Sequence, residues 1–144
     1  MTLQNLVGVG SLKPHNSTAD ELARLLESAE ASLADAKRKS NHPNSRLDLA
    51  YKAIMQSALA ALMANGFRPA TSKPGHQQTT IQTLPRTIGL SAERMLLYDR
   101  FRRARNVADY EGDPIEDKVV EECVAAAQSL LGEVRKWIAA NGPK

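Results

Sequence analysis

The stretch that decides the fold is RLDLAYKAIMQSALAALMAN, residues 46–65. Its apolar residues recur at the three- and four-residue spacing of one helix face. The stripe they form is Leu47, Ala50, Ile54, Ala58, Ala61 and Leu62. The many alanines would let a neighbouring backbone approach closely, and Gly66 stands where a left-handed helix cap is usual. The pattern therefore predicts a helix over 46–65 that packs against other helices.

Three more long helices are predicted around this one. Thr18 and Glu21 form a capping box, in which the two side chains satisfy free amides of the first turn, ahead of a helix over 18–39. Ser91 can cap the next long helix. Its core stripe is Leu97, Phe101, Ala104 and Ala108. The last helix is predicted over 113–141. Its cap, first-turn proline and box residue are Asp113, Pro114 and Glu116.

The remaining segments are predicted to be connectors and one short helix. Residues 1–17 are expected to form an irregular arm, residues 40–45 a turn in which Asn44 or Ser45 caps the following helix, and residues 67–77 a surface loop. A short helix over 79–88 is broken or kinked by its proline. The predicted fold is all-α: an up-down bundle of four long helices plus one short helix, in a single domain over 18–142.

The composition agrees with helices packed on helices, because aromatic residues make up only 4% of a chain that is 42% hydrophobic. A net charge of +3 permits nucleic acid as a partner without requiring it. Cys123 is the only cysteine, which excludes an intramolecular disulfide and a multi-cysteine zinc site, and it is expected to be buried and inert. No apolar run approaches the length of a membrane helix, so we expect a soluble, cytoplasmic protein without a membrane partner.

The segment RFRRARNVADY, residues 100–110, has the character of a functional site. Four arginines in six residues repel one another, and their planar guanidinium groups suit phosphate. At about 100° per residue, two polar strips flank the buried stripe of this helix. One strip contains Arg103, Asn106 and Tyr110, and the other contains Arg102, Arg105 and Asp109, in which the last two can pair. The alternative is a solvated charged face without a function.

Residues 103–110, RARNVADY, resemble the signature of the HEPN superfamily, the higher eukaryote and prokaryote nucleotide-binding domains. That signature is an arginine, often followed by a polar residue such as Asn, then an intervening stretch and a histidine. Arg105 with four intervening residues, or Arg103 with six, fits when Tyr110 takes the position of the histidine. The ending Arg105–Tyr110 is also similar to a variant in small bacterial members. The resemblance extends over about residues 18–140 through the order of the helices.

The resemblance implies a usually dimeric helical bundle in which two copies of the signature face each other. Many members are metal-independent endoribonucleases, often toxins paired with a nucleotidyltransferase antitoxin. It implies that Arg105, Asn106 and Tyr110 form the catalytic group, with the arginine on the scissile phosphate. Tyrosine ordinarily has a pKa of about 10 against about 6.5 for histidine, so it is a poorer base at neutral pH. Binding of RNA or a nucleotide and cleavage of RNA are therefore both open.

Further candidates complete the predicted site. Arg102, Arg103, Asp109 and His76 are assigned to nucleic-acid or phosphate binding, with His76 as a loop residue or a proton carrier. His15 and His42, in polar connectors, are expected to be solvated. No metal and no cofactor are expected, because no two histidines have the spacing of metal ligands. The alternatives are a protein-interaction module, or a DNA-binding accessory protein, that uses the arginine-rich helix.

Overall fold

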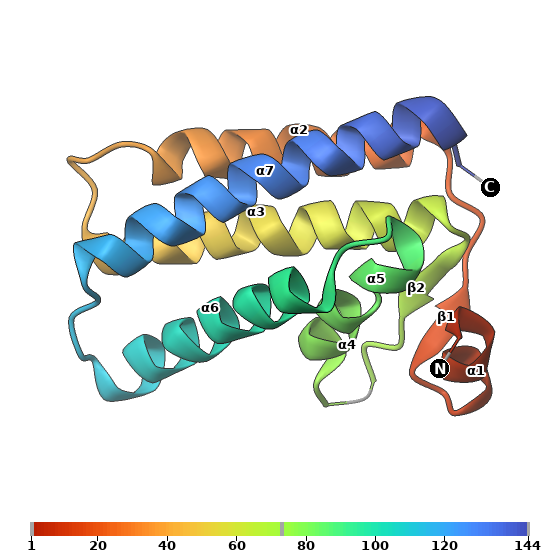
Figure 1. Cartoon of the computed structure of the whole chain (residues 1–144), viewed down its shortest axis with the longest axis horizontal. Helices are drawn as coiled ribbons and strands as arrows, with labels where there is room; N and C mark the ends of the chain where they lie inside the picture. The colour runs from red at the N-terminus through yellow and green to blue at the C-terminus, as the bar shows by residue number, and fades with distance from the viewer. Residues whose placement is uncertain (1, 73, 144) are drawn as a thin grey trace.

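The computed structural model describes residues 2–72 and 74–143. In chain order its elements are α1 (Leu3–Gly8), β1 (Leu12–Pro14), α2 (Ala19–Ala36), α3 (Pro43–Ala64), β2 (Phe67–Pro69), α4 (His76–Gln82), α5 (Leu84–Thr87), α6 (Ala92–Glu111) and α7 (Asp117–Asn141). The four long helices run in alternating directions, α2 and α6 one way and α3 and α7 the other (Figure 1). The predicted up-down bundle of four long helices is confirmed at this level.

α3 is the central helix of the bundle. It packs against α2 and α7 along much of its length and also contacts α4 and α6 (Figure 1). Ala50, Ala53, Ile54, Ala58 and Ala61 are completely buried on it. Because most of these are alanines, α2 and α7 can both lie close to its backbone, as the stretch 46–65 predicted. α6 touches α7 at only a few residues, and the side chains along one face of α6 are exposed.

Two helix starts differ from the prediction. α3 begins at Pro43, and His42 caps it by accepting a hydrogen bond from the Asn44 amide at 3.1 Å, so neither Asn44 nor Ser45 is the cap. α7 begins at Asp117 rather than Asp113. The Ile115 amide donates to Asn44 Oδ1 at 3.3 Å, and the Ile115 side chain packs on the core. Glu116, which follows, has an extended backbone with a ψ of 140° and is the cap, so the helix begins only after it.

The prediction of an irregular arm over residues 1–17 is wrong, because the described part of the arm contains a helix and a strand. Thr2 caps α1 through a capping box with Asn5, and β1 pairs antiparallel with β2, Leu12 opposite Pro69. The expected loop over 67–77 is therefore a strand at its start and the first turn of α4 at its end. Local sequence signals miss this pairing because the two strands are short and far apart in the chain.

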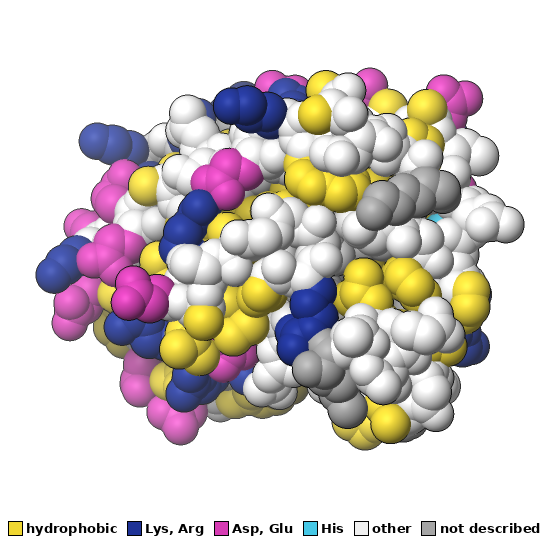
Figure 2. Space-filling model, turned by 45° about the vertical axis from the view of Figure 1, so that its right-hand side comes forward, with side chains coloured by type: hydrophobic (Ala, Val, Ile, Leu, Met, Phe, Trp, Pro, Cys, Tyr) yellow, Lys and Arg dark blue, Asp and Glu magenta, His cyan; other side chains and the backbone are white. Residues whose placement is uncertain are grey.

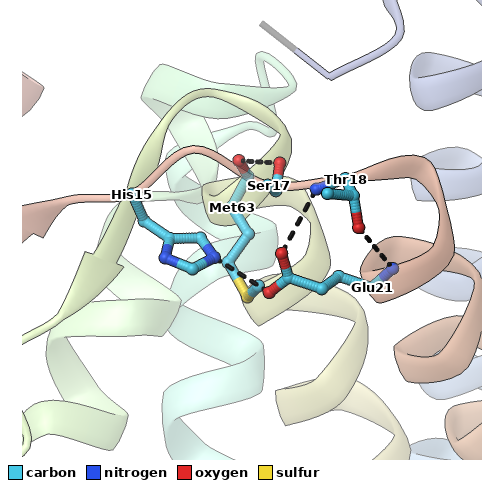
Figure 3. A network of polar contacts seen from close by, with 5 residues as sticks. All are labelled: His15, Ser17, Thr18, Glu21 and Met63. Atoms are coloured by element: carbon cyan, nitrogen blue, oxygen red, sulfur yellow. Dashed lines mark hydrogen bonds and ion pairs between the residues drawn. The ribbon is translucent and has the colours of Figure 1, made fainter.

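A polar network fastens the arm to the bundle (Figure 3). His15 Nε2 lies 2.9 Å from Glu21 Oε2, and Ser17 Oγ donates to the Met63 carbonyl at 2.8 Å. Glu21 also completes the predicted capping box with Thr18. The hydrogen bond from His15 is the largest influence that lowers the pKa of Glu21 below its usual value. The expectation that His15 is solvated is therefore wrong, because it is half-buried against this carboxylate.

The predicted short helix is divided in two, α4 and α5, with Pro85 in the first turn of α5. Cys123 is buried as expected, and burial raises the pKa of its thiol to about 12. Within residues 2–72 and 74–143, no helix is long and apolar enough to cross a bilayer.

Candidate functional site

Local signals at both ends define α6, which carries the arginine segment. Ser91 Oγ accepts from the Arg94 amide at 3.3 Å, and Gly112 ends the helix with a left-handed φ of 70°. Phe101 and Ala108 of the predicted stripe are buried, and Tyr98 is buried beside them. This packing fixes the rotation of α6, so each arginine is directed to one side of the helix.

Asp99 holds two of the four arginines. Arg102 Nε donates to Asp99 Oδ1 at 2.8 Å, and Arg103 Nη2 lies 3.2 Å from Asp99 Oδ2. The Asp99 side chain is largely buried, so solvent screens these ion pairs less than it screens surface pairs. The arginines are therefore positioned by a shared carboxylate and do not simply repel one another.

Arg105 is held by α3. Its Nε donates to Asp48 Oδ1 at 2.7 Å and lies 3.6 Å from Asp109 Oδ2, which confirms the predicted pairing with Asp109. Its guanidinium carbon lies 5.2 Å from the centre of the Tyr51 ring. A charge-assisted hydrogen bond and a cation–π contact together restrict this side chain to one place between the two helices.

Tyr51 is buried, and its ring lies beneath the guanidinium group of Arg105. Its hydroxyl donates to Gln77 Oε1 at 3.2 Å, which links α3 to α4. Burial raises the pKa of Tyr51 to about 12, although the positive charges of Arg105 and Arg102 act in the opposite direction. At physiological pH the hydroxyl therefore stays neutral and remains a hydrogen-bond donor.

These residues line a cleft of about 470 Å³ between α3, α4 and α6, which we call the α3–α6 cleft. Its polar lining is Asp48, Lys52, Gln77 and Arg105, with Ser45 at one side. Leu49, Met55 and the Tyr51 ring supply apolar surface. A cleft of this size with a few convergent polar groups is typical of a small-molecule or nucleotide site.

A second feature lies on the outside of α6. Its members, three or four residues apart, form one line along the helix, the exposed strip: Leu96, Arg100, Arg103, Val107 and Tyr110. Tyr110 is 88% exposed, Leu96 54% and Val107 47%. The Arg103 side chain is 61% exposed, and Arg100 has no ion-pair partner among the residues that the structure describes. The strip thus combines available cations with exposed apolar surface.

The arginine segment contributes to both features. Arg103 and Arg105 are two residues apart, which places them about 200° from each other around the helix. Arg103 and Tyr110 therefore lie on the exposed strip, whereas Arg105 faces α3. Asn106 is half-buried and Asp109 is exposed. The predicted group Arg105, Asn106 and Tyr110 is thus not gathered at one point of a single chain.

His76 begins α4, directly after Gly75, whose φ of 78° only glycine adopts readily. It is half-buried and is not among the residues that line the α3–α6 cleft. Its neighbour Gln77 is the residue of α4 that reaches the cleft.

The sequence patterns did not indicate three residues of the site, Asp48, Tyr51 and Asp99. Asp99 could have been found, because it precedes Arg102 and Arg103 by three and four residues, the spacing of helical ion pairs. Asp48 gives no such signal, since it is 57 residues from Arg105 in the chain.

On the left of the face drawn in Figure 2, the side chains of Lys and Arg are interleaved with those of Asp and Glu. Ion pairs with Asp99, Asp48 and Asp109 likewise neutralise arginines of α6. Particular side chains, rather than a broad positive field on this face, are therefore the candidates for recognition of a ligand.

Asp99→Asn is expected to lower the free energy of unfolding by about 1–2 kcal/mol, because the two charge-assisted contacts with Arg102 and Arg103 weaken. Urea unfolding followed by circular dichroism measures the difference. Asp113→Asn, at an exposed position between α6 and α7, is the matched change in net charge. Equal stabilities of the two variants would contradict a role of Asp99 in holding the arginines.

No group of three or more His, Cys, Asp or Glu side chains in residues 2–72 and 74–143 is arranged to hold a metal ion. The chain matches no protein-family model, no curated protein and no solved structure.

Proposed function

We propose that this chain binds single-stranded RNA through the exposed strip of α6, as a HEPN-like homodimer. The observation that carries the proposal is the single line formed by Arg100, Arg103 and Tyr110 on an uncovered helix face. Proteins that bind single strands combine cations for the phosphates with aromatic rings for the bases. The strip offers both within three turns of one helix.

The two arginines are suited to phosphate. Arg103 uses one terminal nitrogen on Asp99, so its other N–H groups remain available for a phosphate oxygen. Arg100, one helical turn away, has no carboxylate partner among the described residues. The Tyr110 ring, at the end of the strip, is available for stacking on a base.

Leu96 and Val107 are about half exposed and flank the arginines, so the strip also carries apolar surface. A second copy packed on these two residues would cover the arginines between them. The homodimer in this proposal therefore rests on the HEPN resemblance of residues 103–110 and uses a face other than the strip.

The same apolar residues favour a second candidate function, a protein-interaction module without RNA affinity. In that case the strip binds a different protein, for example an acidic one that pairs with Arg100 and Arg103. Cleavage of RNA is the further possibility that the resemblance implies. The strip supports binding of RNA more directly than cleavage of RNA, because Tyr110 stands where the family signature has its histidine.

The experiment is a fluorescence anisotropy titration of the purified chain with a labelled oligouridylate at several salt concentrations. We expect saturable binding that weakens steeply with salt, with a slope of about 0.7 per phosphate contact in log–log form. Sedimentation of the same samples reports the dimer, and a denaturing gel reports whether the RNA stays intact. Absence of RNA binding at low salt would overturn the proposal in favour of the interaction module.

A further inference from the structure

We infer that the α3–α6 cleft binds a guanine base. The cleft lies on the side of α6 that faces α3, about opposite to the exposed strip, so it is a second site and not part of the RNA-binding surface proposed above. Its polar groups come from α3, α4 and α6, and hydrogen bonds hold Asp48, Gln77 and Arg105 in place.

Three polar groups in the cleft remain available to a ligand. Asp48 uses Oδ1 for Arg105, and its Oδ2 has no hydrogen-bond partner among the residues that the structure describes. Gln77 uses Oε1 for the Tyr51 hydroxyl, which leaves its Nε2 as a donor. The Lys52 ammonium has no ion pair within the described ranges, although Asp48 lies one helical turn before it. The cleft thus offers one carboxylate and two donors.

The apolar lining of the cleft and its arginine suit a flat ring. Arg105 already lies over the Tyr51 ring at 5.2 Å, and Asp48 fixes the plane of its guanidinium. Bases commonly stack on arginine planes that are held in this way. Leu49 and Met55 add apolar lining on the same helix as Tyr51. The volume of about 470 Å³ is large enough for a base and part of a sugar.

The order of donors and acceptors selects guanine. Its N1–H and N2–H₂ groups are adjacent donors, which suit Asp48 Oδ2 and the second lone pair of Oδ1, beside the one that accepts from Arg105. Its O6 is an acceptor for Lys52 or Gln77 Nε2. Adenine presents the unprotonated N1 to the carboxylate, where two acceptors repel each other. Uracil has one donor between two acceptors. Cytosine presents its N4–H₂ donor beside the unprotonated N3, so it can satisfy the carboxylate with only one N–H group. A site that accepts two adjacent N–H groups therefore favours guanine over the other bases.

The test is an NMR titration of the ¹⁵N-labelled chain with GMP, AMP, CMP and UMP in separate samples. We expect GMP to shift the resonances of Asp48, Lys52 and Gln77 and to bind at least about fivefold tighter than AMP. Asp48→Asn keeps an acceptor for Arg105 but is expected to remove the preference for GMP. Lys52 is exposed, so Lys52→Gln is expected to leave the fold intact and to weaken the binding of GMP. Lys136→Gln, at the far end of α7, is the matched control.

Free nucleotide and RNA are the two sources of the base, and an oligouridylate with one guanosine distinguishes them. Tighter binding of this oligonucleotide than of the all-uridine oligonucleotide, with a gain that Asp48→Asn removes, assigns the cleft to an RNA strand, and equal binding of the two assigns it to a free nucleotide. Absence of shifts at the cleft with GMP, or equal affinities for GMP and AMP, overturns the inference. The mononucleotides do not require the exposed strip, so this result is independent of whether the chain binds RNA.

Discussion

Arg46→Ala is expected to lower the free energy of unfolding by about 2–4 kcal/mol, the largest loss among single changes of a charged residue in this chain. The Arg46 side chain is only 6% exposed. Its Nε donates to the Ala36 carbonyl at the end of α2, and its Nη2 donates to Glu121 Oε1 on α7, both at 2.8 Å. One side chain of α3 thus joins the ends of two other helices.

The alanine variant loses these bonds and the packing of a long side chain at once. The Ala36 carbonyl is left without its donor in a buried place, which is the costly part of the change. Glu121 is half exposed, so water replaces Arg46 as its partner, and the loss of this ion pair lowers the stability less. Urea unfolding followed by circular dichroism measures the difference. Lys118→Ala, on the exposed side of α7, is expected to change stability by less than about 0.5 kcal/mol. A similarly small effect at Arg46 would show that the three helices do not depend on this contact.

The double variant Arg100→Gln with Arg103→Gln is expected to weaken binding of single-stranded RNA at least about tenfold at low salt. Each guanidinium of the exposed strip is proposed to contact one phosphate. The slope of log affinity against log salt is therefore expected to decrease by about 1.4 per chain, about 0.7 for each contact. Glutamine retains the stem of the side chain and a good helix propensity, so α6 is expected to remain folded.

Arg38→Gln with Arg135→Gln is the control matched in net charge, because both are exposed or partly exposed arginines that pair with Asp35 and Glu30 of α2 rather than with residues of α6. It is expected to leave both the affinity and the slope unchanged. If both variants weaken binding equally, the RNA is held by net charge and the strip has no special role. Circular dichroism of all three proteins excludes unfolding as the cause.

The long helices could be predicted because their signals are local. The apolar spacing of residues 46–65, the Thr18–Glu21 capping box and the Ser91 cap each act within a few turns, and each is present in the structure. The strand pairing of β1 with β2 and the late start of α7 depend on contacts between distant residues. Asn44, for example, holds the Ile115 amide, and no pattern around Ile115 indicates that partner.

The candidate site shows the same division. Helix periodicity correctly placed Arg103 and Tyr110 on one side and paired Arg105 with Asp109. It could not show that Asp48 and Tyr51 of α3 hold Arg105, or that the cleft beside them exists. It also treated the arginines as mutually repulsive, whereas Asp99 neutralises two of them from within the same helix.

The most direct measurement of the central claim is an NMR map of the RNA contact on the ¹⁵N-labelled chain. A short oligouridylate is titrated into the protein, and both backbone amides and arginine Nε–H groups are followed. The account predicts that the largest shifts occur at Arg100, Arg103, Val107 and Tyr110, with α2 and the outer side of α7 unchanged. Shifts confined to α2 and α7, or no shifts at all, would contradict it.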